Sequence, residues 1–225
     1  MKKAIVLLSG GLDSATTLYI ARKRGFHPFC LVFDYGQRQR KEICCAKKIA
    51  RSAGCPVRVL KIQLPSKGSA LLDKKTAIPA YRHRRINNIP ATYVPARNII
   101  FLSFALSYAE AVGAGAIFIG AHVQDYSGYP DCRPEFYRAF SRVIACGTKS
   151  GIKQKKPKVY TPLIGKTKAE IIKLGSQLGV PFQFTWSCYQ GGQNACRKCD
   201  SCHFRAKGFK EAGIRDPLLE KEDER

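Results

Sequence analysis

A glycine pair between an apolar run and a helical segment is the feature that most constrains this chain. The run Lys3–Leu8 leads directly into Ser9–Ser14 (SGGLDS), and a helical pattern begins at about Asp13 and ends at Gly25. Glycines at such a junction let backbone N–H groups turn toward an anion. The serine hydroxyls add donors, and an exposed helix dipole adds about 0.3–1 kcal/mol. The sequence therefore predicts a phosphate-binding loop, with a tight turn of no function as the alternative.

The loop lacks the signatures of two common nucleotide sites. It has neither the Gly-Lys-Ser/Thr of a Walker A loop nor the Gly-x-Gly-x-x-Gly of a dinucleotide site. Without a lysine that acts on the γ-phosphate, it suits a retained pyrophosphate and attack at the α-phosphate, with Asp13 helping to hold Mg²⁺. It resembles the pyrophosphate loop of the ATP α-hydrolase superfamily. The predicted nucleotide-binding residues are Leu8, Ser9, Gly10, Gly11, Leu12, Asp13, Ser14, Ala15, Thr16, Thr17 and Leu18.

Apolar runs alternate with helical segments along the chain, as in βαβ units. The expected strands are Lys3–Leu8, Phe29–Phe33, Val57–Ile62, Ala116–Gly120 and Val159–Leu163. The expected helices are about 13–25, 38–53, 96–112, 134–146 and 167–178, the last opened by a capping box at Thr167–Glu170. This pattern predicts an α/β fold with an open, mostly parallel, doubly wound sheet. We place an ATP pyrophosphate-loop domain at 1–180 and a small zinc-binding C-terminal segment, packed on the same domain, at 181–225.

Charge is the unusual part of the composition. Lysine and arginine number 39 against 16 acidic residues, a net charge of +23, and the basic residues gather at 74–85, 149–158 and 197–210. Such a field attracts nucleotides, carboxylates and nucleic acid alike, and a solvated surface without a dedicated partner is the alternative.

Export and membrane insertion are not expected. No apolar run approaches the roughly 20 residues of a membrane span. The stretch Ala4–Leu8 is shorter than the roughly 7–15 residues of a signal-peptide core. We expect a cytoplasmic protein with no membrane partner.

Four of the ten cysteines stand at metal-ligand spacing, C-x7-C-x2-C-x2-C. They are Cys188, Cys196, Cys199 and Cys202. Four thiolates predict a closed, structural, tetrahedral Zn²⁺ site, one per chain. An iron–sulfur cluster is the rival, but the C-x3-C-P continuation of ferredoxins is missing. His203, beside the last cysteine, is expected to be structural and not a fifth ligand.

A dense polar segment follows the expected strand Ala116–Gly120. Asp125, Asp131, Arg133 and Glu135 fall near the carboxyl end of that strand, where doubly wound sheets bind ligands. Such residues suit the donor edge of a purine-like ring and a substrate carboxylate. A well-ordered turn is the alternative.

Several segments together resemble the QueC family, the 7-cyano-7-deazaguanine synthases. They are Ser9–Ser14, Tyr35–Arg38, Val94–Asn98, Asp125–Phe136, Thr185–Tyr189 and the three later cysteines. The resemblance runs from about residue 3 to residue 217. The chain departs from the family pattern at Gln39, Ala96 and His122, where we expect His, Gly, and Asn or Val.

The resemblance implies an ATP-dependent ligase that makes a nitrile precursor of queuosine and archaeosine from 7-carboxy-7-deazaguanine and ammonia. The carboxylate and then the amide are adenylylated. Arg38, Arg97 and Lys166 are expected to neutralise phosphate charge, and Asp125, Asp131 and Glu135 to contact the deazaguanine edge. The full set of expected substrate-binding or catalytic residues is Tyr35, Gln37, Arg38, Arg97, Asn98, Asp125, Tyr126, Asp131, Arg133, Glu135 and Lys166.

The same resemblance sets the expected partners. ATP with Mg²⁺ is the co-substrate, Zn²⁺ is structural, the protein is a homodimer, and nucleic acid is not required. Two alternatives remain. A tRNA-modifying enzyme of the thiolase or lysidine synthetase type would use the same loop and explain the charge. A basic zinc module that binds nucleic acid would explain the charge but not the loop.

Overall fold

A single parallel sheet forms the centre of the molecule. The computed structural model describes residues 2–81, 89–122 and 129–219. Within these ranges the sheet has five strands in the order β3-β2-β1-β4-β5, and every neighbouring pair is parallel. The strands are β1 (Lys2–Leu7), β2 (Phe26–Asp34), β3 (Val57–Lys61), β4 (Ala116–Phe118) and β5 (Lys158–Tyr160). The expected α/β fold with an open, doubly wound parallel sheet is confirmed.

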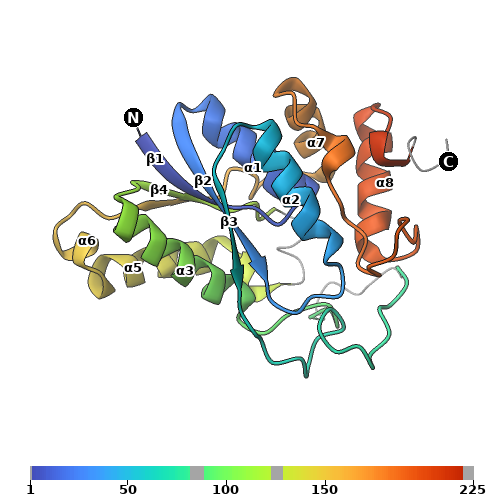
Figure 1. Ribbon diagram of the computed structural model, residues 1–225, viewed down its shortest axis with the longest axis horizontal. Coiled ribbons are helices and arrows are strands. Elements are labelled where there is room, and N and C mark those ends of the chain that lie inside the picture. Colours follow the sequence, from blue (N-terminus) through green and yellow to red (C-terminus); the bar gives the residue numbers. More distant parts are fainter. Residues whose placement is uncertain (1, 82–88, 123–128, 220–225) are drawn as a thin grey trace.

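Helices cover both faces of this sheet (Figure 1). One face carries α1 (Leu12–Lys23), α2 (Lys41–Ser52), α7 (Lys168–Gln177) and α8 (Asp200–Ala212). The other carries α3 (Arg97–Val112) and α5 (Pro134–Gly147), which is followed by the short α6 (Lys149–Ile152). Single 3₁₀ turns lie at Pro130–Cys132 and Phe182–Phe184. Successive residues of β1 alternate between two cores, with Val6 in the first and Ile5 in the second, as the two-residue period of a strand requires.

Several boundaries differ from those expected. Strand β2 begins at Phe26, three residues before the expected start, because Phe26 already pairs with Lys2 of β1. Helix α2 begins at Lys41 and not at 38, since the Gln37 side chain ties the preceding turn to the backbone of Tyr35 and Phe33. The capping box of α7 is confirmed: the Thr167 backbone N–H donates to Glu170 Oε2 at 2.7 Å, and the Glu170 N–H donates to Thr167 Oγ1.

Helix α8 is absent from the expected elements, which treated the C-terminal region only as a metal-binding segment. It packs along α7, and Gly208 allows the close approach, because a Cβ there would lie 2.4 Å from Lys168 Cγ. Phe209 of α8 joins the same core as Ile171 and Ile172 of α7.

The topology fixes where a ligand can bind. Helices α1 and α2 connect β1 to β2 and β2 to β3 on one face, while α3 connects toward β4 on the other face. The strand order therefore reverses between β1 and β4, and open α/β sheets bind ligands at the carboxyl ends of the strands at such a point. None of the helices in the described ranges combines the length and apolar character that crossing a membrane requires.

Candidate active site

The segment Ser9–Ser14 lies at this reversal point, between β1 and α1. Gly10 has φ +92°, and a Cβ built on it would lie 2.1 Å from the backbone oxygen of Glu42 in α2, so only glycine fits. Ser14 Oγ accepts from the Ser9 backbone N–H at 3.2 Å and donates to the Gly11 carbonyl at 3.0 Å. Ser9 Oγ lies 3.0 Å from Ser14 Oγ. The hydroxyls thus hold the loop in shape at the N-terminus of α1, which is a ready anion site.

An ionic cluster stands at the first turn of α1. Lys168 Nζ, from the start of α7, lies 2.8 Å from both oxygens of Asp13 and 3.0 Å from His122 Nε2. His122 Nε2 lies 3.3 Å from Asp13 Oδ2. Burial raises the pKa of the Asp13 carboxyl, but Lys168 and His122 outweigh burial and hold that pKa well below its usual range. Asp13 is therefore ionised at neutral pH, with an ammonium group fixed beside the loop.

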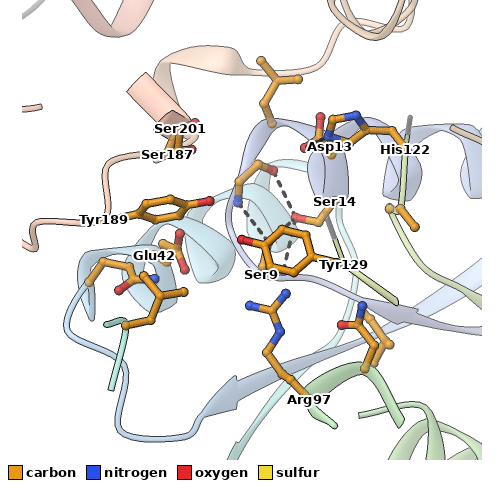
Figure 2. Close-up of a pocket in the computed structure, with 18 of the residues that line it drawn as sticks. Ser9, Asp13, Ser14, Glu42, Arg97, His122, Tyr129, Ser187, Tyr189 and Ser201 are labelled. Carbon is orange, nitrogen blue, oxygen red and sulfur yellow. Dashed lines mark hydrogen bonds and ion pairs between the residues drawn. The ribbon is translucent and has the colours of Figure 1, made fainter. Parts of the chain in front are cut away.

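The loop opens into a cavity of about 470 Å³ (Figure 2). Its walls come from the ends of β1, β2 and β4, from α2 and α3, and from the C-terminal segment. The expected residues that line it are Leu8, Ser9, Gly11, Leu12, Asp13, Ser14, Tyr35, Gln37, Arg97 and Asn98. The expected residues of α1 beyond the loop, Ala15–Leu18, are buried and do not line the cavity.

Other expected substrate residues lie away from the cavity. The Arg38 guanidinium donates to the carbonyls of Asp73 and Thr76 and so holds a neighbouring loop. Glu135 pairs with Arg138 at 2.7 Å on the surface. Arg133 is exposed, and Lys166 is half-buried two residues from the lysine that reaches the loop. None of these lines the cavity.

Asp131 supports the start of α3 and does not line the cavity. It is buried and accepts from the backbone N–H of Asn98 at 3.2 Å, so it fixes the first turn of α3. Asp125 and Tyr126 lie outside the described residues.

Arg97 supplies the cation on the opposite wall. It follows Ala96, which has the left-handed conformation (φ +54°) that favours glycine. Its guanidinium faces the hydroxyl of Tyr35, and burial is the largest influence that raises the pKa of that phenol. In the view of Figure 2, Arg97 points toward Ser9 and Tyr129.

The structure adds cavity residues that the sequence did not single out as site residues. Among them are Gln39, Glu42, Tyr129, Lys168, Trp186, Ser187, Tyr189, Ser201, Arg205 and His122, of which Gln39 and His122 were noted only as departures from the family pattern. The sequence did contain a pattern that could have pointed to Lys168, because this residue begins the helix whose capping box was recognised. No such pattern pointed to Arg205, which lies on the unexpected helix α8 and pairs with Asp216 at 2.6 and 2.8 Å.

The four cysteines form the candidate metal centre. The sulfurs of Cys188, Cys196, Cys199 and Cys202 all lie within 4.8 Å of one another. A Zn–S distance of about 2.3 Å with tetrahedral angles separates sulfurs by roughly 3.8 Å, and the Cys196 and Cys202 sulfurs are 3.9 Å apart. Backbone N–H groups of Cys196 and Gln190 donate to Cys188 Sγ. The donor set and its size therefore fit one tetrahedral metal ion.

The metal centre is joined to the phosphate loop through Trp186. This fully buried residue donates its indole N–H to the Cys188 carbonyl at 2.9 Å, and its backbone N–H donates to the Gly10 carbonyl at 2.9 Å. His203 stacks on Tyr81 with ring centroids 3.6 Å apart and is not in the cysteine group.

The chain is similar to known proteins in sequence and in fold. The family model of the queuosine biosynthesis protein QueC matches residues 3–213. The 7-cyano-7-deazaguanine synthase of Acetivibrio thermocellus is 53% identical over 219 residues, 97% of either chain. That of Thermoplasma volcanium is 49% identical over 218 residues, 96% of this chain and 90% of the relative. Among solved structures, the NMN synthetase of Francisella tularensis is similar in fold, with a TM-score of 0.50 and 15% identity over 98% of this chain and 77% of that one.

Proposed function

The chain belongs to the QueC family, and from this premise we propose that it is an AMP-forming ligase that converts 7-carboxy-7-deazaguanine and ammonia to 7-cyano-7-deazaguanine. The observation that carries the proposal is the Ser9–Ser14 loop, which opens into a cavity at the reversal point of the sheet. Lys168 and Arg97 contribute two cations to that cavity. A phosphate-binding loop beside a concave cavity is the arrangement that nucleotide-dependent enzymes of this fold class use.

The bond changes balance as two adenylylations. A carboxylate oxygen attacks the α-phosphate of ATP and pyrophosphate leaves, which gives an acyl adenylate. Ammonia attacks the acyl carbon and AMP leaves with that oxygen, which gives the amide. The amide oxygen attacks the α-phosphate of a second ATP and pyrophosphate leaves; loss of AMP and of both nitrogen protons then leaves the nitrile. The backbone donors of Ser9–Ser14 would hold the departing pyrophosphate, and Lys168 would offset its charge.

The metal ions have separate places in this proposal. Cys188, Cys196, Cys199 and Cys202 would hold Zn²⁺, and the ion would be structural, because four thiolates leave no open position for substrate. Both Asp13 oxygens already accept from Lys168, so we place Mg²⁺ on the ATP phosphates and not on Asp13 alone. We also propose a cytoplasmic homodimer, as the resemblance implies; light scattering tests the dimer.

The test follows the carboxylate oxygens. Substrate carrying ¹⁸O at both carboxyl positions should yield the nitrile and two AMP molecules, each with one labelled oxygen, detected by mass spectrometry. Formation of ADP and phosphate as the nucleotide products would contradict attack at the α-phosphate. Conversion to the amide without any nitrile would limit the activity to the first of the two adenylylations.

A further inference from the structure

The cavity holds an acceptor pair that the phosphate chemistry does not use. Gln39 and Glu42 both line it, at the turn that leads into α2, and the Glu42 backbone N–H donates to the Gln39 carbonyl at 3.0 Å. Neither was among the residues expected to bind substrate. Of the acidic residues expected at the base edge, Asp131 lies in the 3₁₀ turn Pro130–Cys132 and Glu135 on the surface, while Asp125 lies outside the described residues.

Gln39 is a buried polar side chain without a full set of partners. Only 2% of it is exposed, and within the described part of the chain its Oε1 has no hydrogen-bond donor. The nearby Gln37 differs, because its Oε1 accepts from the Tyr35 N–H at 2.8 Å and its Nε2 donates to the Phe33 carbonyl at 3.0 Å. Buried acceptors in native proteins are nearly always paired, so an orphan that faces a cavity points to a donor brought by a ligand.

The Glu42 carboxyl is the second acceptor in the cavity. Among the described residues its carboxyl has no side-chain hydrogen bond; burial raises its pKa to about 8, and the charge of Arg97 only partly opposes this. A ligand that donates N–H bonds to the carboxylate would offset that burial. In the view of Figure 2, Glu42 lies beside the ring of Tyr189, at the opposite end of the cavity from Asp13 and His122.

We propose that Gln39 and Glu42 are specificity-determining residues that accept the adjacent N1–H and 2-amino donors of the deazaguanine substrate. This rests on the proposed function. A guanine-type base carries these donors side by side, and replacement of N7 by carbon leaves them intact. An amide oxygen and a carboxylate match two adjacent donors. Adenine has an N1 acceptor next to its amino donor, so its N1 lone pair would face the carboxylate. The adenine of ATP should therefore bind at Gln39 and Glu42 less well than the deazaguanine base.

The position of α2 places Gln39 and Glu42 beside the Ser9–Ser14 loop. The Glu42 backbone oxygen lies so close to Gly10 that no Cβ fits between them, so the acceptor pair and the loop share one wall. A base held at Glu42 by its pyrimidine edge carries its C7 carboxyl on the far side of the bicyclic ring. That carboxyl can then extend along the wall toward the loop that holds ATP.

The test compares the natural substrate with its analogue lacking the 2-amino group, 7-carboxy-7-deazahypoxanthine. The wild type should prefer the amino substrate by about 100-fold or more in kcat/KM, since a site built for a donor rejects a ligand without it. Glu42→Gln should lose most of that preference, with the KM for ATP unchanged. Binding of the carboxy-deazaguanine alone, measured by calorimetry without ATP, should weaken in parallel. Glu211→Gln, an exposed glutamate on α8, is the matched control and should behave as wild type.

A second variant guards against loss of folding. Gln39→Met removes the orphan oxygen with similar volume, so the melting temperature should hold or rise while the preference falls about tenfold. Unchanged preference in both variants would overturn the proposal, and so would a raised KM for ATP with the preference intact, because the pair would then read adenine. A wild type that converts neither substrate would instead contradict the proposed function itself.

Discussion

At the scale of single residues, two glycines with similar backbone angles meet different surroundings. Gly10 has φ +92° and would place a Cβ 2.1 Å from the Glu42 carbonyl, whereas Gly36 has φ +88° and meets nothing within 4 Å. Gly36→Ala should cost only the left-handed conformation, about 1–2 kcal/mol in urea unfolding. Gly10→Ala should cost more and abolish AMP formation, because the loop must move away from α2. Wild-type turnover by Gly10→Ala would contradict the fit described for the loop.

The ion pair of Asp13 makes a prediction about acid stability. Burial alone would raise its pKa, but Lys168 and His122 lower it below the usual value of 3.8. A carboxyl with a depressed pKa stabilises the fold fully above 3.8, and this contribution is lost as the pH falls below 3.8 toward the folded-state pKa. In Lys168→Met, Asp13 loses its strongest partner. Stability at pH 7 should fall by about 2 kcal/mol, less than for a fully buried pair, and AMP formation should drop sharply.

Unfolding followed against pH separates the two proteins. The wild type should lose the Asp13 contribution progressively as the pH falls below 4, while Lys168→Met should show a smaller acid-dependent loss. Equal acid profiles would mean that Lys168 does not set the pKa of Asp13.

The pKa of Glu42 is shifted in the opposite direction from that of Asp13, and this makes a prediction about ligand binding. Its pKa is raised to about 8 by burial, against the charge of Arg97, while Tyr35 and Cys45 are the other titratable groups that interact with it. If the substrate donates to the carboxylate, its affinity should strengthen as pH rises toward 8 and level off above it. Calorimetry in buffers of different ionisation enthalpy should detect a proton released on binding near pH 7. Glu42→Gln should show neither effect.

At the scale of elements, the sequence was most informative where one physical signal dominated. Within the described residues, the apolar period located the five strands and helices α1, α2, α3 and α5, and the capping box located the start of α7. The Ser9–Ser14 loop and the cysteine group follow from local spacing. Helix α8 was missed because its cysteine and glycine content indicates a metal-binding segment, and its few buried residues give a weak helical period.

Long-range contacts explain the rest of what sequence reasoning missed. Lys168 meets Asp13 across 155 positions in the sequence, a pairing that no local pattern contains. Lys166 was chosen in its place because only the tertiary fold decides which lysine near Thr167 turns toward the loop. Glu42 entered no prediction for the same reason: its place on the cavity wall depends on how α2 packs against Gly10.

Helix α8 is anchored by a buried ion pair, and this can be tested. Arg205 and Asp216 have side chains only 6% and 4% exposed, and they form a bidentate pair. Asp216→Ala should lower the free energy of unfolding by roughly 3–5 kcal/mol, because it leaves a buried guanidinium without its counter-ion. Glu211→Gln breaks only the surface contact with Lys207 at 3.7 Å and should leave stability unchanged. A small effect of Asp216→Ala would show that water or another group replaces the carboxylate.

At the scale of the whole molecule, Trp186 links the cysteine group to the Ser9–Ser14 loop, so we expect the two to behave as one unit. Cys199→Ser should give zinc-poor protein with low solubility, and any soluble fraction should bind ATP weakly, because Trp186 holds Gly10. Cys146→Ser changes an exposed cysteine outside the cluster and should retain one zinc ion. Elemental analysis and ATP binding on the same samples provide the test. A zinc-free, fully active Cys199→Ser protein would contradict the structural role, and iron in the wild type would indicate the cluster alternative.

The net charge of +23 is a property of the whole chain, and the way it acts on substrates tests the proposed function against a tRNA-modifying enzyme. Described lysines of the basic stretches, such as Lys74, Lys153 and Lys207, do not line the cavity. We therefore expect them to act on anionic substrates only at long range, through a field that salt screens over about 8–10 Å at 0.10–0.15 M. Raising the salt concentration should lower kcat/KM while kcat stays nearly constant, and turnover of the free base should proceed without RNA. Added tRNA should only compete, and more weakly at higher salt. A strict requirement for tRNA would instead mean that the basic surface positions a macromolecular substrate at the cavity.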